Sequence, residues 1–138
     1  MGKIALVTGG SRGIGAATVK ALAQEGYDIV VNYNANGDTA EEVAGEARAS
    51  GVRAITVRAD VAQEDQVVAM FETVDRELGN LDALVNNAGI NGRSARVDEL
   101  MADEITALLQ TNVLGPMLCS REAVKRMSTK YGGAGGGI

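Results

Sequence analysis

Thr8-Gly9-Gly10-Ser11-Arg12-Gly13-Ile14-Gly15 follows a short apolar run, Ile4-Ala5-Leu6-Val7, and leads into an alanine-rich helical pattern. A strand that stops at glycines and turns directly into a helix presents unpaired backbone N–H groups and a partial positive charge, and both attract an anion. Glycine has no Cβ, so the chain can turn tightly and a phosphate can approach the backbone closely. Taken alone, the stretch fits either a phosphate-binding loop or an ordinary turn between a strand and a helix.

The segments that follow alternate between apolar runs and helical patterns. Largely apolar runs at 29–31, 54–57 and 83–85 are typical of strands that are buried on both faces. Between them we expect a helix over 13–24, a second from Asp38 to near Gly51, and a third with its apolar face at Val67, Phe71, Val74 and Leu78. The first of these helices is expected to bury one face made of Ile14, Ala17, Ala21 and Leu22.

This β-α-β-α-β-α-β order with short connections predicts a parallel sheet with helices on both faces. Right-handed crossovers give the strand order 3-2-1-4 of a Rossmann-type, doubly wound α/β fold, and residues 1–138 form a single domain. A ligand is expected where the order reverses, beyond the carboxyl ends of strands one and four. The glycine-rich stretch follows strand one, and Asn86-Asn87-Ala88-Gly89 follows strand four. Two such loops at one crevice favour a dinucleotide site over an ordinary turn.

The residues after Gly89 predict a polar connection and then helix from about Asp98. Apolar residues spaced three or four apart place Asn112 on the apolar, inward face of that helix. A polar amide there needs a partner. Asn112 either bonds to nearby backbone as a structural residue or holds a water or a catalytic side chain. The only proline, Pro116, is expected to kink or restart the helix. The basic residues near its end, Lys125, Arg126 and Lys130, are expected to be solvated.

Composition limits the function classes. The net charge is −5, and no basic stripe or aromatic platform is present, so we expect no nucleic-acid partner. No apolar run approaches a membrane span and no signal peptide is recognisable, so no membrane partner is expected. The single cysteine, Cys119, and the absence of histidine fit a cytoplasmic protein without a zinc site. The chain stops where a fifth strand should begin, at Ile138, and we expect the second half of the fold to be truncated.

Together these motifs resemble the N-terminal half of a short-chain dehydrogenase/reductase, most of all bacterial 3-oxoacyl-acyl-carrier-protein-reductase-like and glucose-dehydrogenase-like members. The resemblance covers all 138 residues and rests on the glycine-rich stretch, Asp60-Val61, Asn86-Asn87-Ala88-Gly89 and Asn112. It implies that Asn112 is the family's catalytic asparagine, which holds a water in a proton relay. It also implies a homo-oligomer, commonly a tetramer, packed through the helices after strand four.

The resemblance further implies a set of cofactor contacts. Asp60 would accept a hydrogen bond from the adenine amino group, with Val61 beside it. Asn86 would pin strand four to its neighbour. The backbone that cradles the pyrophosphate would run through Gly9, Ser11, Arg12, Gly13, Ile14 and Gly15. The ribose side of the crevice would be lined by Asn87, Ala88 and Gly89.

The residues after the second strand predict NADP as the cofactor. An NAD site uses a carboxylate there for the ribose 2′-hydroxyl, and Asn32-Tyr33-Asn34 supplies no acid. Arg12 could bind a 2′-phosphate through charge-assisted hydrogen bonds. By the resemblance, Tyr33 and Asn34 would add contacts to the same phosphate.

We therefore expect the parent protein to be an NADP(H)-dependent oxidoreductase that passes hydride between nicotinamide and a small-molecule carbonyl or secondary alcohol. The family's catalytic Ser and Tyr-x-x-x-Lys lie beyond residue 138. None of Tyr27, Tyr33 and Tyr131 has a lysine four residues later. The alternatives are a catalytically inactive dinucleotide-binding fragment and an inert, poorly folded truncation.

Overall fold

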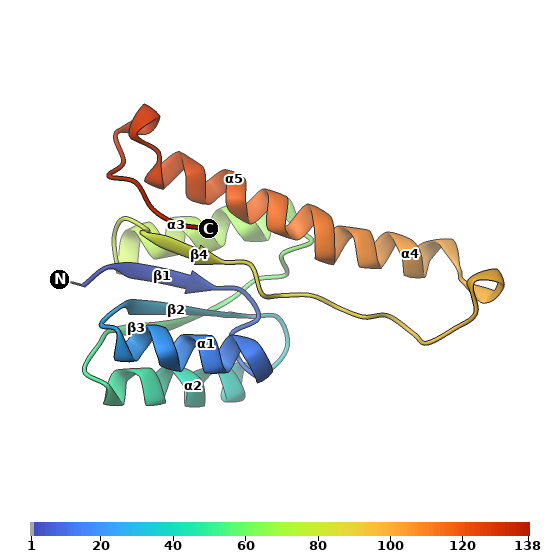
Figure 1. The fold of residues 1–138 in the computed structure, drawn as a ribbon, viewed down its shortest axis with the longest axis horizontal. Helices are drawn as coiled ribbons and strands as arrows, with labels where there is room; N and C mark the ends of the chain where they lie inside the picture. Colours follow the sequence, from blue (N-terminus) through green and yellow to red (C-terminus); the bar gives the residue numbers. More distant parts are fainter. Residues whose placement is uncertain (1) are drawn as a thin grey trace.

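A computed structural model describes residues 2–138 and contains a parallel sheet between two layers of helices (Figure 1). Short apolar runs form the strands, and amphipathic segments form most of the helices. The strands are β1 (Ile4–Val7), β2 (Asp28–Tyr33), β3 (Ala54–Arg58) and β4 (Ala83–Val85). The helices are α1 (Gly13–Gln24), α2 (Gly37–Ala49), α3 (Glu64–Glu77), α4 (Ala102–Leu109) and α5 (Gly115–Met127). Shorter turns are the 3-10 helices η1 (Val97–Glu99) and η3 (Thr129–Tyr131) and the π-helix η2 (Gln110–Leu114).

The strand order is β3-β2-β1-β4, and every pairing is parallel, which confirms the predicted order. Register places Leu6 of β1 beside Val30 of β2 and Leu84 of β4. Parallel strands in register bring their carboxyl ends to one edge of the sheet, where the loops after β1 and β4 meet. Beyond β4, Gly137 forms a parallel bridge with Ala83, so the last residues return along the outer edge of β4.

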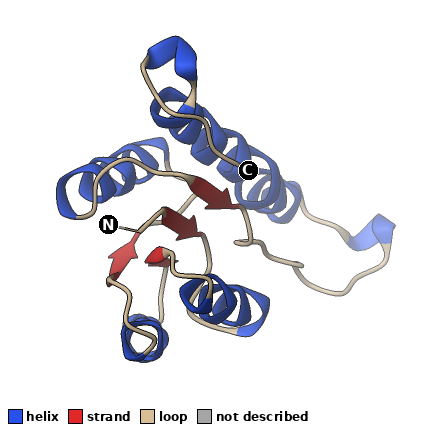
Figure 2. Cartoon of the chain, turned by 60° about the vertical axis from the view of Figure 1, so that its left-hand side comes forward, coloured by secondary structure: helices blue, strands red, loops and turns tan. Residues whose placement is uncertain are grey.

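Helices cover both faces of the sheet (Figure 2). On one face, α1 and α2 pack against alternate residues of β1 and β2 around Val7 and Val31. On the other face, α3 and α5 pack around Leu6, Val30 and Phe71. The predicted apolar face of α3 is confirmed, because Val67, Phe71, Val74 and Leu78 are all buried.

The predicted buried face of α1 is wrong. The helix buries Gly15, Val19 and Ala23, while Ile14 is 80% exposed. The buried residues are spaced by four and are small or β-branched, which lets α1 lie close to β1. Apolar spacing alone selected the neighbouring stripe, because alanine-rich helices have apolar residues on more than one face.

Residues 90–114, here called the arm, extend beyond the sheet, and the rest of the chain is called the body (Figure 1). None of residues 90–114 is buried. The prediction that Met101, Ile105 and Asn112 face inward is therefore wrong in this chain, although the helix itself forms as predicted. The arm is joined to α5 through the π-turn η2, where Gly115 N–H bonds to Gln110 O. The change in helix geometry predicted near Pro116 thus occurs in the turn just before it.

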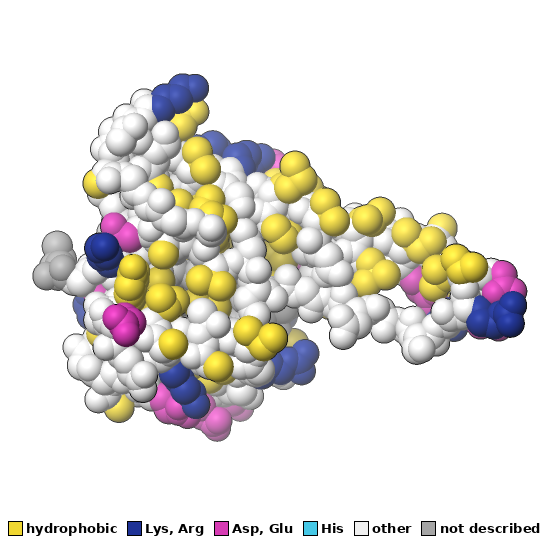
Figure 3. Space-filling model, in the orientation of Figure 1, with side chains coloured by type: hydrophobic (Ala, Val, Ile, Leu, Met, Phe, Trp, Pro, Cys, Tyr) yellow, Lys and Arg dark blue, Asp and Glu magenta, His cyan; other side chains and the backbone are white. Residues whose placement is uncertain are grey.

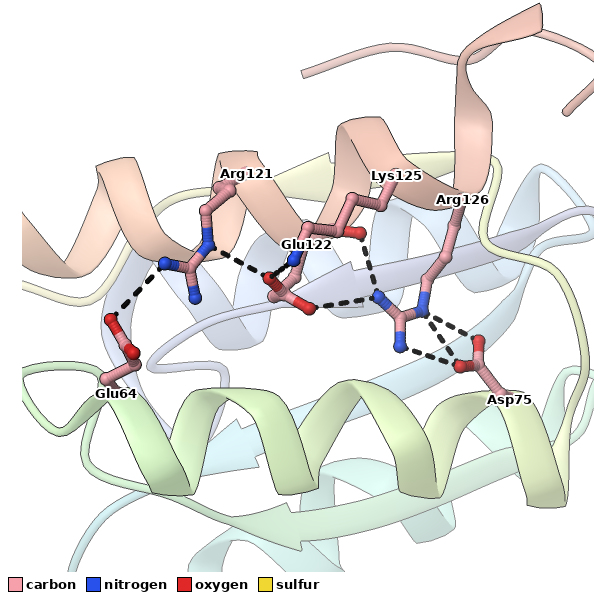
Figure 4. A network of polar contacts seen from close by, with 6 residues as sticks. All are labelled: Glu64, Asp75, Arg121, Glu122, Lys125 and Arg126. Carbon is pink, nitrogen blue, oxygen red and sulfur yellow. Dashed lines mark hydrogen bonds and ion pairs between the residues drawn. The ribbon is translucent and has the colours of Figure 1, made fainter. Parts of the chain in front are cut away.

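A buried carboxylate on α5, Glu122, lies at the centre of a network of charges between α5 and α3 (Figure 4). The side chain of Glu122 is 5% exposed and pairs with Lys125 at 2.9 Å, Arg121 at 3.0 Å and Arg126 at 3.5 Å. Arg126 also pairs with Asp75 of α3 at 2.7 Å and lies over the Phe71 ring. The prediction of a solvated basic end is wrong for Arg126, whose side chain is 16% exposed.

The charges around Glu122 determine its protonation. Burial alone would raise the pKa of this carboxyl, but hydrogen bonds from Lys125 and Arg121, with their charges, lower the pKa below its ordinary value. The carboxylate therefore stays ionised inside the helix pair and satisfies three cations. With Arg121 also pairing to Glu64, the six residues drawn in Figure 4 join α3 to α5.

Candidate functional site

A cavity of about 770 Å³ opens at the carboxyl edge of the sheet, between the loops after β1, β2, β3 and β4. Its size lies within the range of small-molecule and cofactor sites. The sequence prediction placed a ligand at this switch point, and the cavity brings its candidate residues together. From the predicted set it is lined by Gly9, Ser11, Arg12, Gly13, Ile14, Tyr33, Asn34, Asp60, Val61, Asn87, Ala88 and Gly89. Two predicted residues, Gly15 and Asn112, are not in its lining; Gly15 lies beneath the loop.

The glycine-rich loop is built for close approach. Gly9 and Gly13 have φ of +60° and +57°, a region that residues with a Cβ rarely adopt. A Cβ on Gly15 would overlap the Gly9 carbonyl oxygen and lie 2.5 Å from Asn87 Nδ2. The first turn of α1 carries no acidic residue, so its N–H groups face the cavity without a competing charge. The loop therefore fits a phosphate on geometric grounds.

Ile14 is exposed because it stands at the start of α1, at the rim of the cavity. It does not help to hold α1 on the sheet. The same position gives its side chain access to a ligand above the loop.

Thr8, the last residue before the glycines, links the loops after β1 and β4, a role that the sequence pattern does not predict. It is 2% exposed, and its hydroxyl oxygen accepts hydrogen bonds from the N–H groups of Asn87 and Ala88, both at 3.0 Å. Asn87 Nδ2 in turn donates to the carbonyl oxygens of Thr8 and Gly9 at 3.0 Å. The loops after β1 and β4 are thus locked together. Asn87 lines the cavity while its amide hydrogens hold the glycine-rich loop.

Asn32 is a second residue whose role the sequence did not reveal. It lies in β2 rather than in a polar loop, and it is 2% exposed. Its Oδ1 accepts from Gly9 N–H at 3.1 Å, and its backbone oxygen accepts from Gly10 N–H at 2.8 Å. The only sequence signal was a polar side chain where the alternation with Val30 predicts an apolar one.

The end of β2 presents no carboxylate to the cavity. Tyr33 is half-buried with its ring against Gly37, and Asn34 is exposed. Arg58 donates from Nε to the Asn34 carbonyl oxygen at 3.0 Å, which steadies this loop. Arg12 is exposed at the cavity rim, and no ion pair within residues 2–138 uses it. The rim therefore carries an available cation and no acid from β2.

Asp60 and Val61 form the wall that follows β3. One carboxylate oxygen of Asp60 accepts from Ala62 N–H at 3.0 Å, which fixes the turn and leaves the other oxygen for a ligand. Gln66 accepts from the Asp60 N–H at 2.8 Å. Val61 is buried, and α5 approaches it so closely that a Cβ on Gly115 would lie 2.7 Å from Val61 Cγ2. The wall is thus held from both sides.

Asn112 lies in the π-turn η2, is exposed, and forms two hydrogen bonds to the loop after β4. Its Oδ1 accepts from Ile90 N–H at 2.8 Å, and its Nδ2 donates to Ile90 O at 2.7 Å. Of the two roles that the spacing left open, backbone bonding is the one with an observed partner. The side chain is wrongly predicted as buried, because the inward face of the arm has no cover in this chain.

Asn86 is expected to pin β4 to its neighbour. Its Nδ2 donates to Ser120 Oγ on α5 at 3.1 Å, so the neighbour that it holds is the helix layer. Beyond the ladder, β4 is pinned to β1 by Thr8, by Asn87 and by Asp82, whose Oδ2 accepts from Ile4 N–H at 2.8 Å.

Two further properties of the described residues bear on the site. No group of three or more Cys, Asp and Glu side chains within residues 2–138 is arranged to hold a metal ion. None of the helices in the same part of the chain combines the length and apolar character needed to cross a bilayer.

Residues 3–138 match the family model described as short chain dehydrogenase. An uncharacterized oxidoreductase of Escherichia coli K12, YgfF, is 53% identical over 135 residues, which cover 98% of this chain and 55% of the relative. The 3-oxoacyl-(acyl-carrier-protein) reductase FabG of Staphylococcus aureus is 41% identical over 134 residues, covering 97% of this chain and 54% of the relative. The chain therefore belongs to the short-chain dehydrogenase family.

Solved structures agree in fold. A short chain dehydrogenase from Burkholderia cenocepacia, crystallised in complex with NADP, aligns with a TM-score of 0.87 at 43% identity, covering 91% of this chain and 51% of that one. The chain spans about half the length of the curated relatives it matches. Oxidoreductase family membership, the Rossmann-type sheet and a site of the dinucleotide-binding kind are thus supported.

Proposed function

We propose that this chain is the cofactor half of an NADP(H)-dependent short-chain oxidoreductase, acting on a small-molecule carbonyl or secondary alcohol. One observation carries the proposal: the cavity at the switch point combines an acid-free glycine-rich loop with a β2 end that lacks a carboxylate. When bound, the dinucleotide supplies hydride transfer at its nicotinamide. The whole protein's activity and substrate are part of the proposal, because the chain spans about half of its relatives.

The residues present have separate tasks in this proposal. The backbone from Gly9 to Gly15 holds the pyrophosphate at the N-terminus of α1. Asp60, with Val61 beside it, accepts the adenine amino group through its free carboxylate oxygen. Asn87, Ala88 and Gly89 line the ribose and nicotinamide side.

NADP rather than NAD follows from charge. A carboxylate at the end of β2 would repel a 2′-phosphate, and none is present. Arg12 stands exposed at the same rim, where its guanidinium can pair with a phosphate in a charge-assisted, bidentate contact. Tyr33 and Asn34 complete the pocket around the 2′ position. The NADP complex of the Burkholderia cenocepacia relative supports this choice.

We assign Asn112 to the catalytic side of the cavity, where the family role is to hold a water in a proton relay. Its side chain is committed to the Ile90 backbone, so that water would be held by the backbone that the pair positions. Within these 138 residues no tyrosine is followed by a lysine four residues later. Proton transfer to substrate therefore belongs to the whole protein and not to this stretch.

We also propose a homo-oligomer, a tetramer in its full form, in the cytoplasm. The arm and α5 expose a row of apolar side chains, visible along the projecting part of Figure 3. Met101, Leu109, Val113 and Met117 are each at least half exposed. Packing this row against a second copy would remove it from water.

Calorimetric titration of the chain with NADPH and NADH tests the cofactor proposal. NADPH should bind about 10-fold more tightly or better, and Arg12→Ala should weaken NADPH by about 10-fold while leaving NADH nearly unchanged. Arg76→Ala is the matched control, because Arg76 is an exposed residue of α3. Equal affinities, or no loss on Arg12→Ala, would overturn the NADP assignment. Failure of both dinucleotides to bind would overturn the proposed function.

The intact mass of the protein from its native cells separates the enzyme from a binding fragment. A product of 14.2 kDa that binds NADPH but reduces no carbonyl supports the fragment alternative. A heavier product that oxidises NADPH in a carbonyl screen supports the enzyme.

A further inference from the structure

Asn32 lies buried at the floor of the cavity, and its side-chain amide forms hydrogen bonds to two other segments of the chain. Its Nδ2 donates to the carbonyl oxygens of Ala59 at 3.1 Å and Val57 at 3.3 Å, while its Oδ1 accepts from Gly9 N–H at 3.1 Å. The amide has two hydrogens on nitrogen, and both are used. One side chain therefore bonds the loop after β1 and the end of β3 at the same time.

The position is unusual for a polar residue. Side chains two apart in a strand share a face, and Val30, two residues earlier, lies in the apolar cluster beneath α3. A buried amide is costly unless its hydrogen bonds are made. Here they are made with the backbone of Gly9, Val57 and Ala59, of which Gly9 and Ala59 line the cavity. An apolar side chain of similar size would fill the space but would leave Gly9 N–H, Val57 O and Ala59 O without this partner.

The two ends of the amide lead to two parts of the proposed cofactor site. Gly9 begins the loop that is proposed to hold the pyrophosphate. Ala59 immediately precedes Asp60, the proposed partner of adenine, and its N–H is held by Tyr33 O at 2.9 Å. We call residues 9–15 the phosphate loop and residues 59–61 the adenine wall. One buried side chain therefore connects the phosphate loop to the adenine wall and fixes their relative placement. No other side chain in residues 2–138 bonds both to the glycine-rich loop and to the end of β3.

We propose that Asn32 is a positioning residue that couples the phosphate loop to the adenine wall, so that a nucleotide's 5′-phosphate and its adenosine bind as one site. This inference rests on the proposed function. If it is correct, the gain in affinity from a 5′-phosphate depends on Asn32, because the loop is then held at the distance that the adenosine requires. Loss of the amide lets the loop and the wall move independently, and the two parts of the ligand no longer reinforce each other.

The test compares two probes that differ by that phosphate, adenosine and adenosine 5′-monophosphate, by calorimetry or by NMR titration. For the unaltered chain the monophosphate should bind at least about 10-fold more tightly. For Asn32→Ala this ratio should fall to about threefold or less, while the affinity for adenosine changes by less than about threefold. Asn80→Ala, an exposed asparagine at the opposite edge of the sheet, should keep the original ratio.

Amide exchange gives a readout without ligand. Gly9 N–H should exchange at least about 10-fold faster in Asn32→Ala, while Gly10 N–H, bonded to the backbone of residue 32, should change less.

The outcomes are distinct. If the unaltered chain binds neither probe, the proposed function fails and takes this inference with it. If it binds both and Asn32→Ala keeps the ratio, or loses both affinities equally, the coupling is refuted while the proposed function stands. Should Asn32→Ala not fold, Asn32→Ser, whose hydroxyl is too short to span both partners, replaces it. A lowered ratio in Asn32→Ser then supports the coupling, and an unchanged ratio refutes it.

Discussion

The body and the arm have similar apolar patterns, but the apolar side chains are buried in the body and exposed in the arm. In the body, all four residues of β1 are buried, and α3 buries Val67, Met70, Phe71 and Val74. In the arm, α4 has a clear apolar stripe, yet Leu109 is 56% and Met101 is 58% exposed. The difference lies in what the fold places opposite each stripe. A helical apolar period therefore indicates which face seeks cover, and the covering surface has to be found elsewhere.

The residues proposed to act in the site divide between the body and the arm in the same way. The cavity lies almost entirely between body loops that are cross-bonded by Thr8, Asn32 and Asn87. The arm reaches the site through the Asn112–Ile90 pair and the lining residues 90, 91 and 111. The proposed nucleotide contacts belong to the cross-bonded body, and the proposed catalytic asparagine stands in the exposed arm.

The largest effect should come from emptying the body core. Phe71→Ala removes a fully buried ring and should lower the free energy of unfolding by about 3–5 kcal/mol, from the lost transfer energy and the cavity that remains. In the monomeric chain, where no second copy covers the arm, Leu109→Ala should change it by less than about 0.5 kcal/mol. Urea denaturation followed by circular dichroism measures both. A large loss on Leu109→Ala would mean that the arm is covered in solution.

The contact between α5 and α3 within the body should give the next largest effect. Glu122→Gln leaves Arg121, Lys125 and Arg126 without their shared carboxylate and should cost about 3 kcal/mol. Glu77→Gln is the matched control, because its exposed pair with Arg76 should contribute less than about 1 kcal/mol. Equal losses for the two variants would show that the buried network does not anchor α5.

The same network predicts a pH dependence. The pKa of Glu122 is lowered in the folded chain from its ordinary value of 4.5, so the carboxylate's contribution to stability is complete above that value. It is lost as the pH falls through the lowered pKa, where the folded carboxyl takes up its proton. Thermal melts of the unaltered chain should lose stability below about pH 4.5, and Glu122→Gln should lose less over that window.

The fold was predictable because the strands and most helices depend on local patterns. Largely apolar runs gave β1 to β4 their places, and short connections with right-handed crossovers then left one strand order. The covered face of α1 was not predictable in the same way, since Ile14, Ala17 and Ala21 form a stripe as regular as the true one. Which stripe is buried depends on how closely the helix lies on β1, a distance that only the folded chain sets.

The candidate site divides in a similar manner. Positions defined by backbone geometry, such as Gly9 and Gly13, could be placed at the cavity from the motif and the topology, and Asp60 from the family resemblance. Residues that act through long-range hydrogen bonds could not. Thr8 bonds to residues 79 and 80 positions away, and the partners of Asn32 lie on two other segments. Their side chains are ordinary in the sequence, and only the meeting of strand ends gives them partners.

The smallest expected effects come from two glycine substitutions, which test whether the tight packing of the body includes the backbone beside the cavity. Gly15→Ala gains helix propensity, but its Cβ would overlap the Gly9 carbonyl and crowd Asn87 Nδ2, so a net loss of about 1–3 kcal/mol is expected. Gly45→Ala on α2 meets nothing within 4 Å and should instead stabilise the chain by about 0.5–1 kcal/mol. Paired thermal melts give both signs. If Gly15→Ala also stabilises, the loop yields to a methyl group, and its fit to a phosphate does not depend on the close contact between Gly15 and Gly9. If it destabilises and Gly45→Ala does not, the tight packing of the body reaches the very backbone that faces the cavity.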